Sequence, residues 1–248
     1  MDELSRGPRQ AVSHAATKAW ERIGAAVYDP VVATAERRGM AECRRRLLAS
    51  AKGAVVEIGA GTGLNVPYYP REITSLVLTE PTAAMAAHLR RRVRTARPDT
   101  KVIETPGDRL PAESGSVDTV VSTLVLCTVP DPEAVLAEIV RVLRPNGQFL
   151  FCEHVRSDVP ASARWQDRLA GPWSVFAQGC RCNRRTLATI EETFGGVEVD
   201  RGVWQGMPAI VRPLVIGRAV PGSESGGVEG STGGYEVRPR AVESGGEK

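Results

Sequence analysis

The sequence lacks the features that mark membrane proteins, secreted proteins and nucleic-acid-binding proteins. Its 248 residues contain no run near the roughly 18 unbroken apolar residues of a membrane span, and no signal peptide opens them. The five cysteines are odd in number and lack the regular spacing of a disulfide framework. A net charge of +3 gives little attraction for nucleic acid. We therefore expect a cytoplasmic protein with neither a membrane span nor a nucleic-acid partner.

Catalytic histidines and metal-binding cysteine pairs are equally scarce. Of only three histidines, His14 and His88 fall on expected helices, where solvent exposure accounts for them, and His154 follows an expected strand. Cys180 and Cys182 are separated by one residue and have no second pair at matching spacing. Because a zinc site needs a complete ligand set, this spacing falls short of one. We expect no metal.

The two ends of the chain differ in composition from the middle. From residue 221 to 248 the chain is rich in glycine, serine and charge, and it has too little apolar surface to repay the entropy of ordering. We expect this segment to be a disordered tail. Residues 1–27 are expected to form a helical extension with a loose start. One domain should then occupy residues 28–220.

Strands and helices alternate within that domain. Continuous apolar strands separated by helices indicate a mostly parallel sheet covered on both faces. The expected fold class is therefore a doubly wound, Rossmann-like α/β fold whose last strand is antiparallel. Pro145-Asn146-Gly147 should turn the chain into the fifth strand. The expected strands are Ala54–Ile58, Ser75–Thr79, Lys101–Thr105, Asp118–Leu124, Gln148–Glu153, Val197–Val203 and Leu214–Val220.

The helices are indicated by their apolar spacing and by their start signals. Asp131-Pro132-Glu133 combines a capping residue, a proline at the first position and an acid in the first turn. Tyr28-Asp29-Pro30 should break the N-terminal helical region in two. The expected helices are Arg9–Ala26, Val31–Ala51, Thr82–Ala96, one from Pro132 to Leu143, and helical material within residues 161–194.

Three alternating glycines follow the first expected strand, in the stretch "VVEIGAGTGLN". Gly59, Gly61 and Gly63 indicate a turn where the backbone approaches a bulky polar ligand closely. The dinucleotide fingerprint G-x-G-x-x-G would need a third glycine where Leu64 stands. The pattern present is E-x-G-x-G-x-G, with Glu57 at the end of the strand.

In this arrangement the chain resembles the class I S-adenosylmethionine-dependent methyltransferases, over about residues 28–220. "VVEIGAGTG" is similar to their first motif, whose loop passes beside the methionine part of S-adenosylmethionine. "LVLTEP" is similar to the second, which implies that Glu80 accepts hydrogen bonds from both ribose hydroxyls. "PGDRLP" implies that Asp108 meets the adenine amino group. The cofactor-binding residues that the resemblance implies are Glu57, Gly59, Ala60, Gly61, Thr62, Gly63, Asn65, Glu80, Pro81, Asp108, Arg109 and Leu124.

A narrower likeness is to the thiol S-methyltransferase branch of the methyltransferase-like proteins. The segments "STLVLCTV", "LRPNGQFLFCEHV", Trp173 to Cys180 and "VRPLVIGRAV" carry it. That branch has an apolar N-terminal membrane anchor, whereas residues 10–27 here are only mildly amphipathic. The same motifs are also similar to those of quinone C-methyltransferases and phospholipid N-methyltransferases. The resemblance therefore implies methyl transfer to a small molecule, first of all a thiol.

The chemistry of a thiol acceptor needs little from the protein. A thiol with a pKa near 8.5 is already partly ionised at neutral pH, so a base is optional, while a phenol or an amine needs more help. His154 is the candidate catalytic residue, as a base or substrate contact, with a structural hydrogen bond as the alternative. Glu153 is a weaker candidate, and Cys127 is expected to be small apolar packing near the cofactor.

Three aromatic side chains could form the walls of an apolar acceptor pocket, although ordinary core packing explains them equally well: Trp165, Trp173 and Phe176. The leading function is S-adenosylmethionine-dependent methylation of a small thiol. The alternatives are O-, C- or N-methylation of a phenol, quinol or amine, and a non-catalytic S-adenosylmethionine-binding module.

Overall fold

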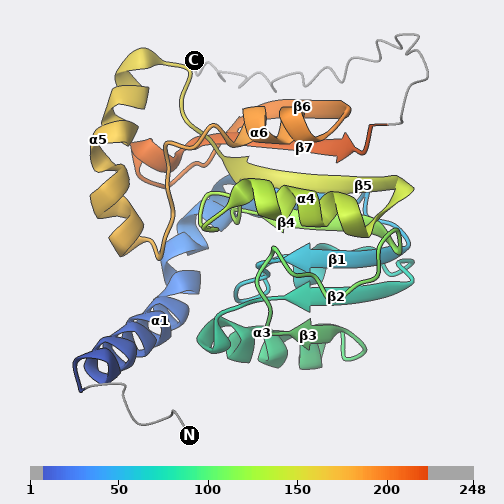
Figure 1. The fold of residues 1–248 in the computed structure, drawn as a ribbon, viewed down its shortest axis with the longest axis horizontal. Coiled ribbons are helices and arrows are strands. Elements are labelled where there is room, and N and C mark those ends of the chain that lie inside the picture. The colour runs from blue at the N-terminus through green and yellow to red at the C-terminus, as the bar shows by residue number, and fades with distance from the viewer. Residues whose placement is uncertain (1–7, 223–248) are drawn as a thin grey trace, which may run out of the picture.

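A seven-stranded sheet forms the centre of the protein (Figure 1). This computed structural model describes residues 8–222, with side chains placed from Lys18 onward. The strand order is β3-β2-β1-β4-β5-β7-β6, and β7 runs antiparallel between β5 and β6 while the other neighbouring strands are parallel. The expected doubly wound α/β class is confirmed. The strands are β1 Ala54–Ile58, β2 Ser75–Thr79, β3 Lys101–Ile103, β4 Val117–Thr123, β5 Leu143–His154, β6 Gly196–Val203 and β7 Pro213–Val220.

The fifth strand differs from its expected form. Residues 145–147 were expected as a turn before the strand, but β5 already starts at Leu143. Its register jumps, because Val117 faces Leu143 while Thr119 faces Gln148. The segment between these pairs therefore bulges out of the ladder, as the proline and glycine in it favour. The turn residues make a bulge inside a strand instead of a boundary.

The N-terminal helical region also differs. Helix α1, Pro8–Ala35, continues through Pro30, so the expected break at residues 28–30 is wrong. The chain kinks later, in the π-helical turn η1, Glu36–Met40, where Gly39 has a φ of 128°. Burial of apolar side chains on the same helix, such as Val32, offsets the free-energy cost of a proline inside a helix. The helix therefore crosses the proposed boundary between residues 27 and 28.

The remaining helices cover both faces of the sheet. They are α2 Ala41–Leu48, α3 Ala83–Ala96, α4 Pro132–Val142, α5 Pro160–Phe176 and α6 Thr186–Thr193. One core lies under α1, α2 and α3, and includes Leu48 and Leu89, while the other lies under α4 and α6, and includes Leu136 and Ile190. The expected start of α4 is confirmed, since the Asp131 carboxylate accepts a hydrogen bond from the Ala134 amide at 3.0 Å.

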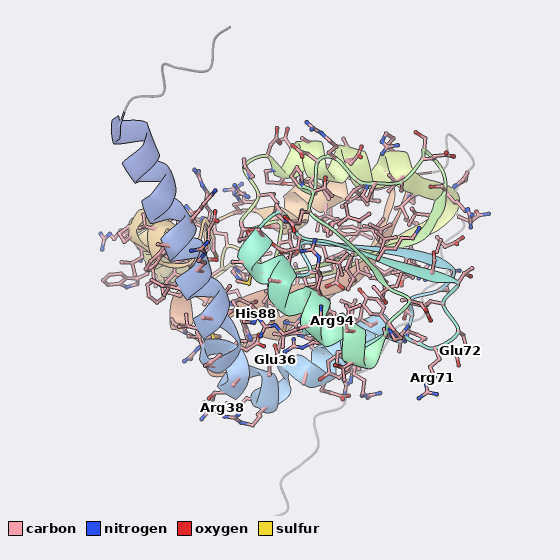
Figure 2. All side chains as sticks on the ribbon, turned by 90° about the horizontal axis from the view of Figure 1, so that it is seen from below. Glu36, Arg38, Arg71, Glu72, His88 and Arg94 are labelled. Carbon is pink, nitrogen blue, oxygen red and sulfur yellow. The ribbon has the colours of Figure 1, made fainter. Side chains whose placement is uncertain are left out.

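Helix α5 and the N-terminal part of α1 lie apart from these two layers, beside the edge toward which β1 and β2 point (Figure 1). In Figure 2 the N-terminal half of α1 extends beyond the rest of the domain, and Glu36 lies near the other end of the helix. None of the helices within residues 8–222 is long and apolar enough to cross a membrane. The expected tail falls outside the described residues, apart from its first two positions.

Candidate active site at the carboxyl ends of the strands

A cavity of about 500 Å³ opens at the carboxyl ends of the parallel strands. Ligands bind at this edge in doubly wound sheets, because loops of adjacent strands diverge there. One end of the cavity is polar and is lined by the loops after β1, β2, β3 and β4. The other end is apolar and is lined by α1 and α5. The polar end includes Gly59, Gly61, Glu80, Asp108 and Leu124, and the apolar end Trp20, Ile23, Val27, Val31, Trp173 and Phe176.

The glycine loop forms the floor of the polar end. Gly59 has a φ of 55° and Gly61 a φ of 57°, a region that favours glycine. A Cβ on Gly59 would lie 2.7 Å from a methyl carbon of Val125, whereas a Cβ on Gly61 would meet no atom within 4 Å and would project into open space. The bare Gly61 backbone thus leaves room that a bound molecule can fill. Ala60 is buried, and its amide donates to the Thr79 carbonyl at 2.8 Å.

Glu80 stands at the tip of β2 with its carboxylate held from two sides. Its Oε2 accepts the Gly61 amide at 2.9 Å and its Oε1 accepts the Thr82 amide at 2.8 Å. Burial nevertheless raises the pKa of Glu80, against the lowering effect of these two amides. The carboxylate lines the cavity and keeps lone pairs free for hydroxyl donors.

A network of buried polar side chains lies beneath the glycine loop. Glu57 is 2% exposed, and its carboxylate accepts hydrogen bonds from Asn65 Nδ2 at 2.8 Å and from the Tyr69 hydroxyl at 2.7 Å. Burial raises the pKa of Glu57 to about 7, although both donors act to lower it. We call Glu36, Arg44, Glu57, Asn65 and Tyr69 the carboxylate network.

Arg44 completes this network and was not expected from the sequence. Its Nη1 donates to Asn65 Oδ1 at 2.8 Å, and its guanidinium pairs with Glu36 at 3.1 Å. Only 4% of Arg44 is exposed. A signal did exist, because Leu47 and Leu48 follow at three and four positions and place Arg44 on the buried face of α2.

A second, smaller cavity of about 30 Å³ lies between this network and the glycine loop. Arg44 and Tyr28 line it together with Thr62, whose hydroxyl donates to Asp29 at 2.6 Å. Burial raises the pKa of Tyr28 to about 12. Tyr28 is a further lining residue that the sequence did not indicate, because Pro30, two positions later, predicts a helix break at this point.

The other expected cofactor residues lie at different depths. Pro81 and Asp108 line the main cavity, and Asp108 is exposed at its rim. Leu124 lines it too, with an unusual φ of 62° and its amide bonded to the Cys152 carbonyl at 2.8 Å. Arg109 is exposed and does not line the cavity. Gly63 lies behind the loop with a φ of 88°.

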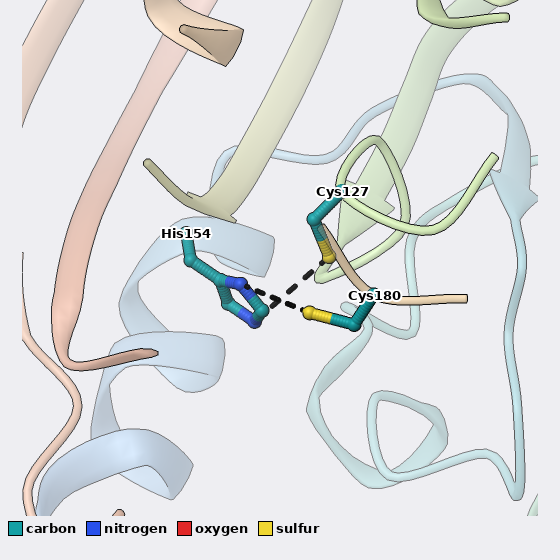
Figure 3. A group of neighbouring side chains, drawn as sticks. All are labelled: Cys127, His154 and Cys180. Carbon is teal, nitrogen blue, oxygen red and sulfur yellow. Dashed lines mark hydrogen bonds between the residues drawn. The ribbon is translucent and has the colours of Figure 1, made fainter. Parts of the chain in front are cut away.

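His154 lies in a buried group with two cysteines (Figure 3). Its Nε2 is 3.8 Å from Cys127 Sγ and its Nδ1 is 3.7 Å from Cys180 Sγ. We call these three residues the sulfur cluster. Contact with Cys127, supported by the His154 imidazole, lowers the pKa of Cys180 to about 5, while contact with Cys180 and burial raise that of Cys127. The two thiols are therefore unequal, because Cys180 gives up its proton more easily than a free thiol and Cys127 holds its own more tightly.

The sulfur cluster lies behind the cavity wall. Trp173 lines the cavity, and its Nε1 donates to Cys180 Sγ at 3.4 Å. Phe176 also lines the cavity, with its ring centroid 5.7 Å from that of Trp173, whereas Trp165 is 56% exposed and lies outside it. Cys182 does not join the cluster, because its thiol faces the Gln166 carbonyl at 3.9 Å.

Glu153 has a structural role, because its carboxylate is bonded to the end of β4 and to the loop that follows. Its Oε1 accepts the Ser122 hydroxyl at 2.5 Å and the Val125 amide at 3.1 Å, and its Oε2 accepts the Leu126 amide at 3.1 Å. These bonds hold the loop after β4, which carries Leu124 and Cys127. With its oxygens occupied by the loop, Glu153 is poorly placed to exchange protons with a substrate in the cavity.

Comparison with known proteins identifies the class. The family described as Methyltransferase domain matches residues 56–151. Human thiol S-methyltransferase TMT1B is 34% identical over 177 residues, which are 69% of this chain and 72% of that protein. Human thiol S-methyltransferase TMT1A is 29% identical over 199 residues, 78% of this chain and 81% of that protein. A solved methyltransferase from Thermotoga maritima superimposes with a TM-score of 0.63 at 21% identity, covering 82% of this chain and 99% of its own.

The chain belongs to the methyltransferase domain family, and it is an S-adenosylmethionine-dependent methyltransferase. The cavity fits this cofactor in its chemistry. It combines an acidic side chain at a strand tip, a glycine loop with open space above Gly61, and apolar side chains beyond Leu124. The ribose diol of the cofactor needs a hydrogen-bond acceptor, its methionine chain needs backbone that can approach closely, and its methyl group needs apolar surroundings. The cavity offers all three.

Proposed function

We propose that the enzyme methylates the sulfur of a small thiol. The observation that carries this proposal is that no histidine or lysine lines the main cavity, within the residues that the structure describes, and that its most buried carboxylate is bonded to backbone amides. Among the carboxylates that line the cavity, Glu80 is held by two amides, Asp131 caps α4 and Asp108 lies at the rim. Tyr28 keeps its proton, because burial raises its pKa to about 12.

A cavity of this kind suits an acceptor that ionises by itself. When bound, S-adenosylmethionine supplies a sulfonium-activated methyl group that the lone pair of an acceptor can take up by in-line displacement. Thiols near pH 7 are already a few per cent thiolate, and thiolates are strong nucleophiles. The apolar walls from α1 and α5 would hold the acceptor and exclude water. Two relatives named as thiol S-methyltransferases, similar over most of the chain, support the same choice.

The cofactor roles follow from the positions of the side chains. We assign the ribose hydroxyls to Glu80 and the adenine amino group to Asp108, with Pro81 and Leu124 flanking them. The methionine part would lie over the glycine loop. Arg44 faces the small cavity beside this loop, and its cation suits a carboxylate. The carboxylate network, including Glu57, would position the loop from below.

His154 takes a positioning role in this proposal. It lies behind Trp173 and outside the lining of the cavity, so the imidazole acts on the acceptor only through Cys180 and the indole. We therefore expect His154→Ala to reduce thiol turnover by less than about tenfold, whereas the loss of a true base costs roughly a hundredfold or more.

The test is a screen of purified enzyme with S-adenosylmethionine against alkyl thiols, phenols and amines, measuring release of S-adenosylhomocysteine. With thiols the rate should rise with pH toward the pKa of the free thiol. Phenol turnover that collapses in His154→Ala, without any thiol turnover, would replace this function by O-methylation. No turnover with any acceptor would favour a cofactor-binding module.

The setting we propose follows from the cysteines. All five are free, and four of them are buried. Free thiols persist in a reducing compartment, so we assign the protein to the cytoplasm, with a small-molecule substrate and no nucleic-acid partner. Fractionation of cells that express a tagged full-length chain tests this assignment.

A further inference from the structure

The sulfur cluster has the composition of a metal site. Thiolate sulfur and imidazole nitrogen are the ligands that zinc prefers in proteins. In the part of the chain that the structure describes, one group of at least three ligating side chains is close enough to share an ion, and it consists of Cys127, His154 and Cys180. All three are buried, and their ligand atoms lie within 4.8 Å of one another.

We propose that Cys127, His154 and Cys180 bind a zinc ion behind the wall of the main cavity. Three protein ligands leave the fourth coordination position of a tetrahedral zinc ion to a water molecule. None of the three side chains lines the main cavity, so the methyl acceptor is not a ligand of this ion.

The distances are slightly longer than those of an occupied zinc site. Zinc–sulfur and zinc–nitrogen bonds near 2.3 and 2.0 Å place a sulfur and a nitrogen ligand about 3.5 Å apart in tetrahedral coordination. The observed separations from His154 are 3.8 Å to Cys127 and 3.7 Å to Cys180. Each sulfur faces a different ring nitrogen, so ion binding requires one sulfur to swing toward the nitrogen that binds. This movement is small, because the three ligand atoms already lie within 4.8 Å of one another.

The surroundings hold the three ligands in place. Trp173 Nε1 donates to Cys180 Sγ at 3.4 Å, which is the type of outer contact that orients a thiolate ligand. The His154 ring stacks on Trp204, with ring centroids 5.6 Å apart. The Arg181 amide donates to the Cys127 carbonyl at 2.8 Å and ties two of the ligand-bearing segments together.

The cluster is also next to the acceptor end of the cavity. Cys127 belongs to the same loop as Leu124 and Thr128, both of which line the cavity. Trp173 forms part of the cavity wall and contacts Cys180 from the other side. Trp173 thus separates the proposed ion from the space in which an acceptor would lie, so the ion would support the cavity wall without contacting the acceptor.

The experiment is a cobalt titration of the full chain, kept reduced and freed of metal with a chelator. Co²⁺ should bind at one equivalent, with a sulfur-to-cobalt charge-transfer band and the strong visible bands of a tetrahedral ion. Cys180→Ser and His154→Asn should weaken cobalt binding by more than about a hundredfold, since loss of an outer partner alone costs 10–100-fold. Cys182→Ser is the matched control, a buried neighbour outside the cluster, and should leave the cobalt affinity unchanged.

Because a buried variant can fail to fold, a second measurement uses the unaltered protein. Zinc should slow alkylation of Cys127 and Cys180 by iodoacetamide and leave the rate at Cys43 unchanged. Absence of the charge-transfer band, or labelling that zinc does not alter, would overturn the site. A disulfide between Cys127 and Cys180 that persists in the presence of zinc and reductant would overturn it as well.

Two outcomes separate this proposal from the proposed function. Cobalt binding without thiol turnover keeps the metal site and rejects the thiol function. Thiol turnover without cobalt binding keeps the function and rejects the site.

Discussion

The carboxylate network and the sulfur cluster lie behind opposite ends of one cavity, and they are built differently. The network comes from residues 36–69, so neighbouring elements supply all of it, and its groups are bonded at 2.7–3.2 Å. The sulfur cluster joins three distant segments through contacts of 3.7–3.8 Å. The side chains at the polar end are therefore already organised to bind a charged ligand. At the sulfur end the thiol and imidazole groups are held less closely, so a metal ion can still bring them nearer to one another.

The largest effect that separates the two regions is expected from Arg44→Ala. Removing one partner of a buried ion pair leaves the other charge uncompensated, which costs about 3–5 kcal/mol of the free energy of unfolding. Glu36 keeps some contact with solvent, so we expect the lower end of that range. Chemical denaturation measures it.

Arg45→Ala is the matched control for that variant. Arg45 is adjacent and also pairs with an acid, Glu42, but both side chains are well exposed. Exposed pairs contribute little to stability, because solvent and salt screen the two charges. Equal losses for the two arginines would show that the carboxylate network contributes nothing beyond an ordinary surface pair.

The second effect is a pH dependence that belongs to Glu57. Its folded-state pKa of about 7 lies above its ordinary value of 4.5, so between these values the folded state binds more protons. The stabilisation is therefore complete below about pH 4.5 and is lost as the pH rises to about 7. At about 1.4 kcal/mol per pKa unit, the loss is on the order of 3 kcal/mol.

Glu57→Gln mimics the protonated acid and should remove this slope. The measurement is the difference in unfolding free energy between the two proteins, without cofactor, from pH 4.5 to 7.5. The difference cancels contributions from other acids such as Glu80 and Glu153, whose pKa values burial also raises. If the unfolding free energies of the two proteins change with pH in parallel, Glu57 is not the titrating group.

The third effect concerns cofactor affinity at the polar end. Glu80→Ala should weaken S-adenosylmethionine binding by about 1–3 kcal/mol, the scale of charge-assisted hydrogen bonds. Isothermal titration calorimetry measures it, with Glu72→Ala as the exposed control on the loop before β2. The cobalt affinity of the sulfur cluster should stay the same. An unchanged dissociation constant would exclude Glu80 from the ribose role.

The smallest effect is expected at the sulfur end from Trp173→Phe. Phenylalanine keeps an aromatic wall but lacks the N–H that contacts Cys180. We expect cobalt affinity to fall by about tenfold, and the acceptor KM to rise, with cofactor affinity unchanged. Trp165→Phe serves as the exposed control outside the cavity. Equal changes for both tryptophans would break the proposed link between the cavity wall and the cluster.

Local patterns predicted most of the fold. The expected β1 and β2 match residue for residue, and α4 starts at its capping Asp131 as expected. These elements depend on apolar runs and on caps that lie within a few residues of each other. The helix through Pro30 could not be predicted in this way, because its continuation depends on packing of Val32 against the distant core.

Part of the candidate site also stands out in the sequence. Gly59, Gly61 and Glu80 stand out because a ligand-binding turn needs bare backbone and a free carboxylate at fixed offsets from a strand. Their grouping in one cavity agrees with the expectation for those positions. His154 also stood out, but its burial behind Trp173 did not, since nothing near it in the sequence indicates which side chains cover it.

The sequence by itself thus determined the α/β class, the succession of strands and helices along the chain and the glycine loop, because periodicity, capping and turn chemistry act over short distances. Only the tertiary structure decided that Cys180 meets Cys127 and His154 and not its neighbour Cys182. Such a contact between segments far apart in the chain depends on how helices and loops pack onto the sheet. No local spacing encodes that packing, which is why two isolated cysteines and one histidine carried no metal signal until the fold brought them together.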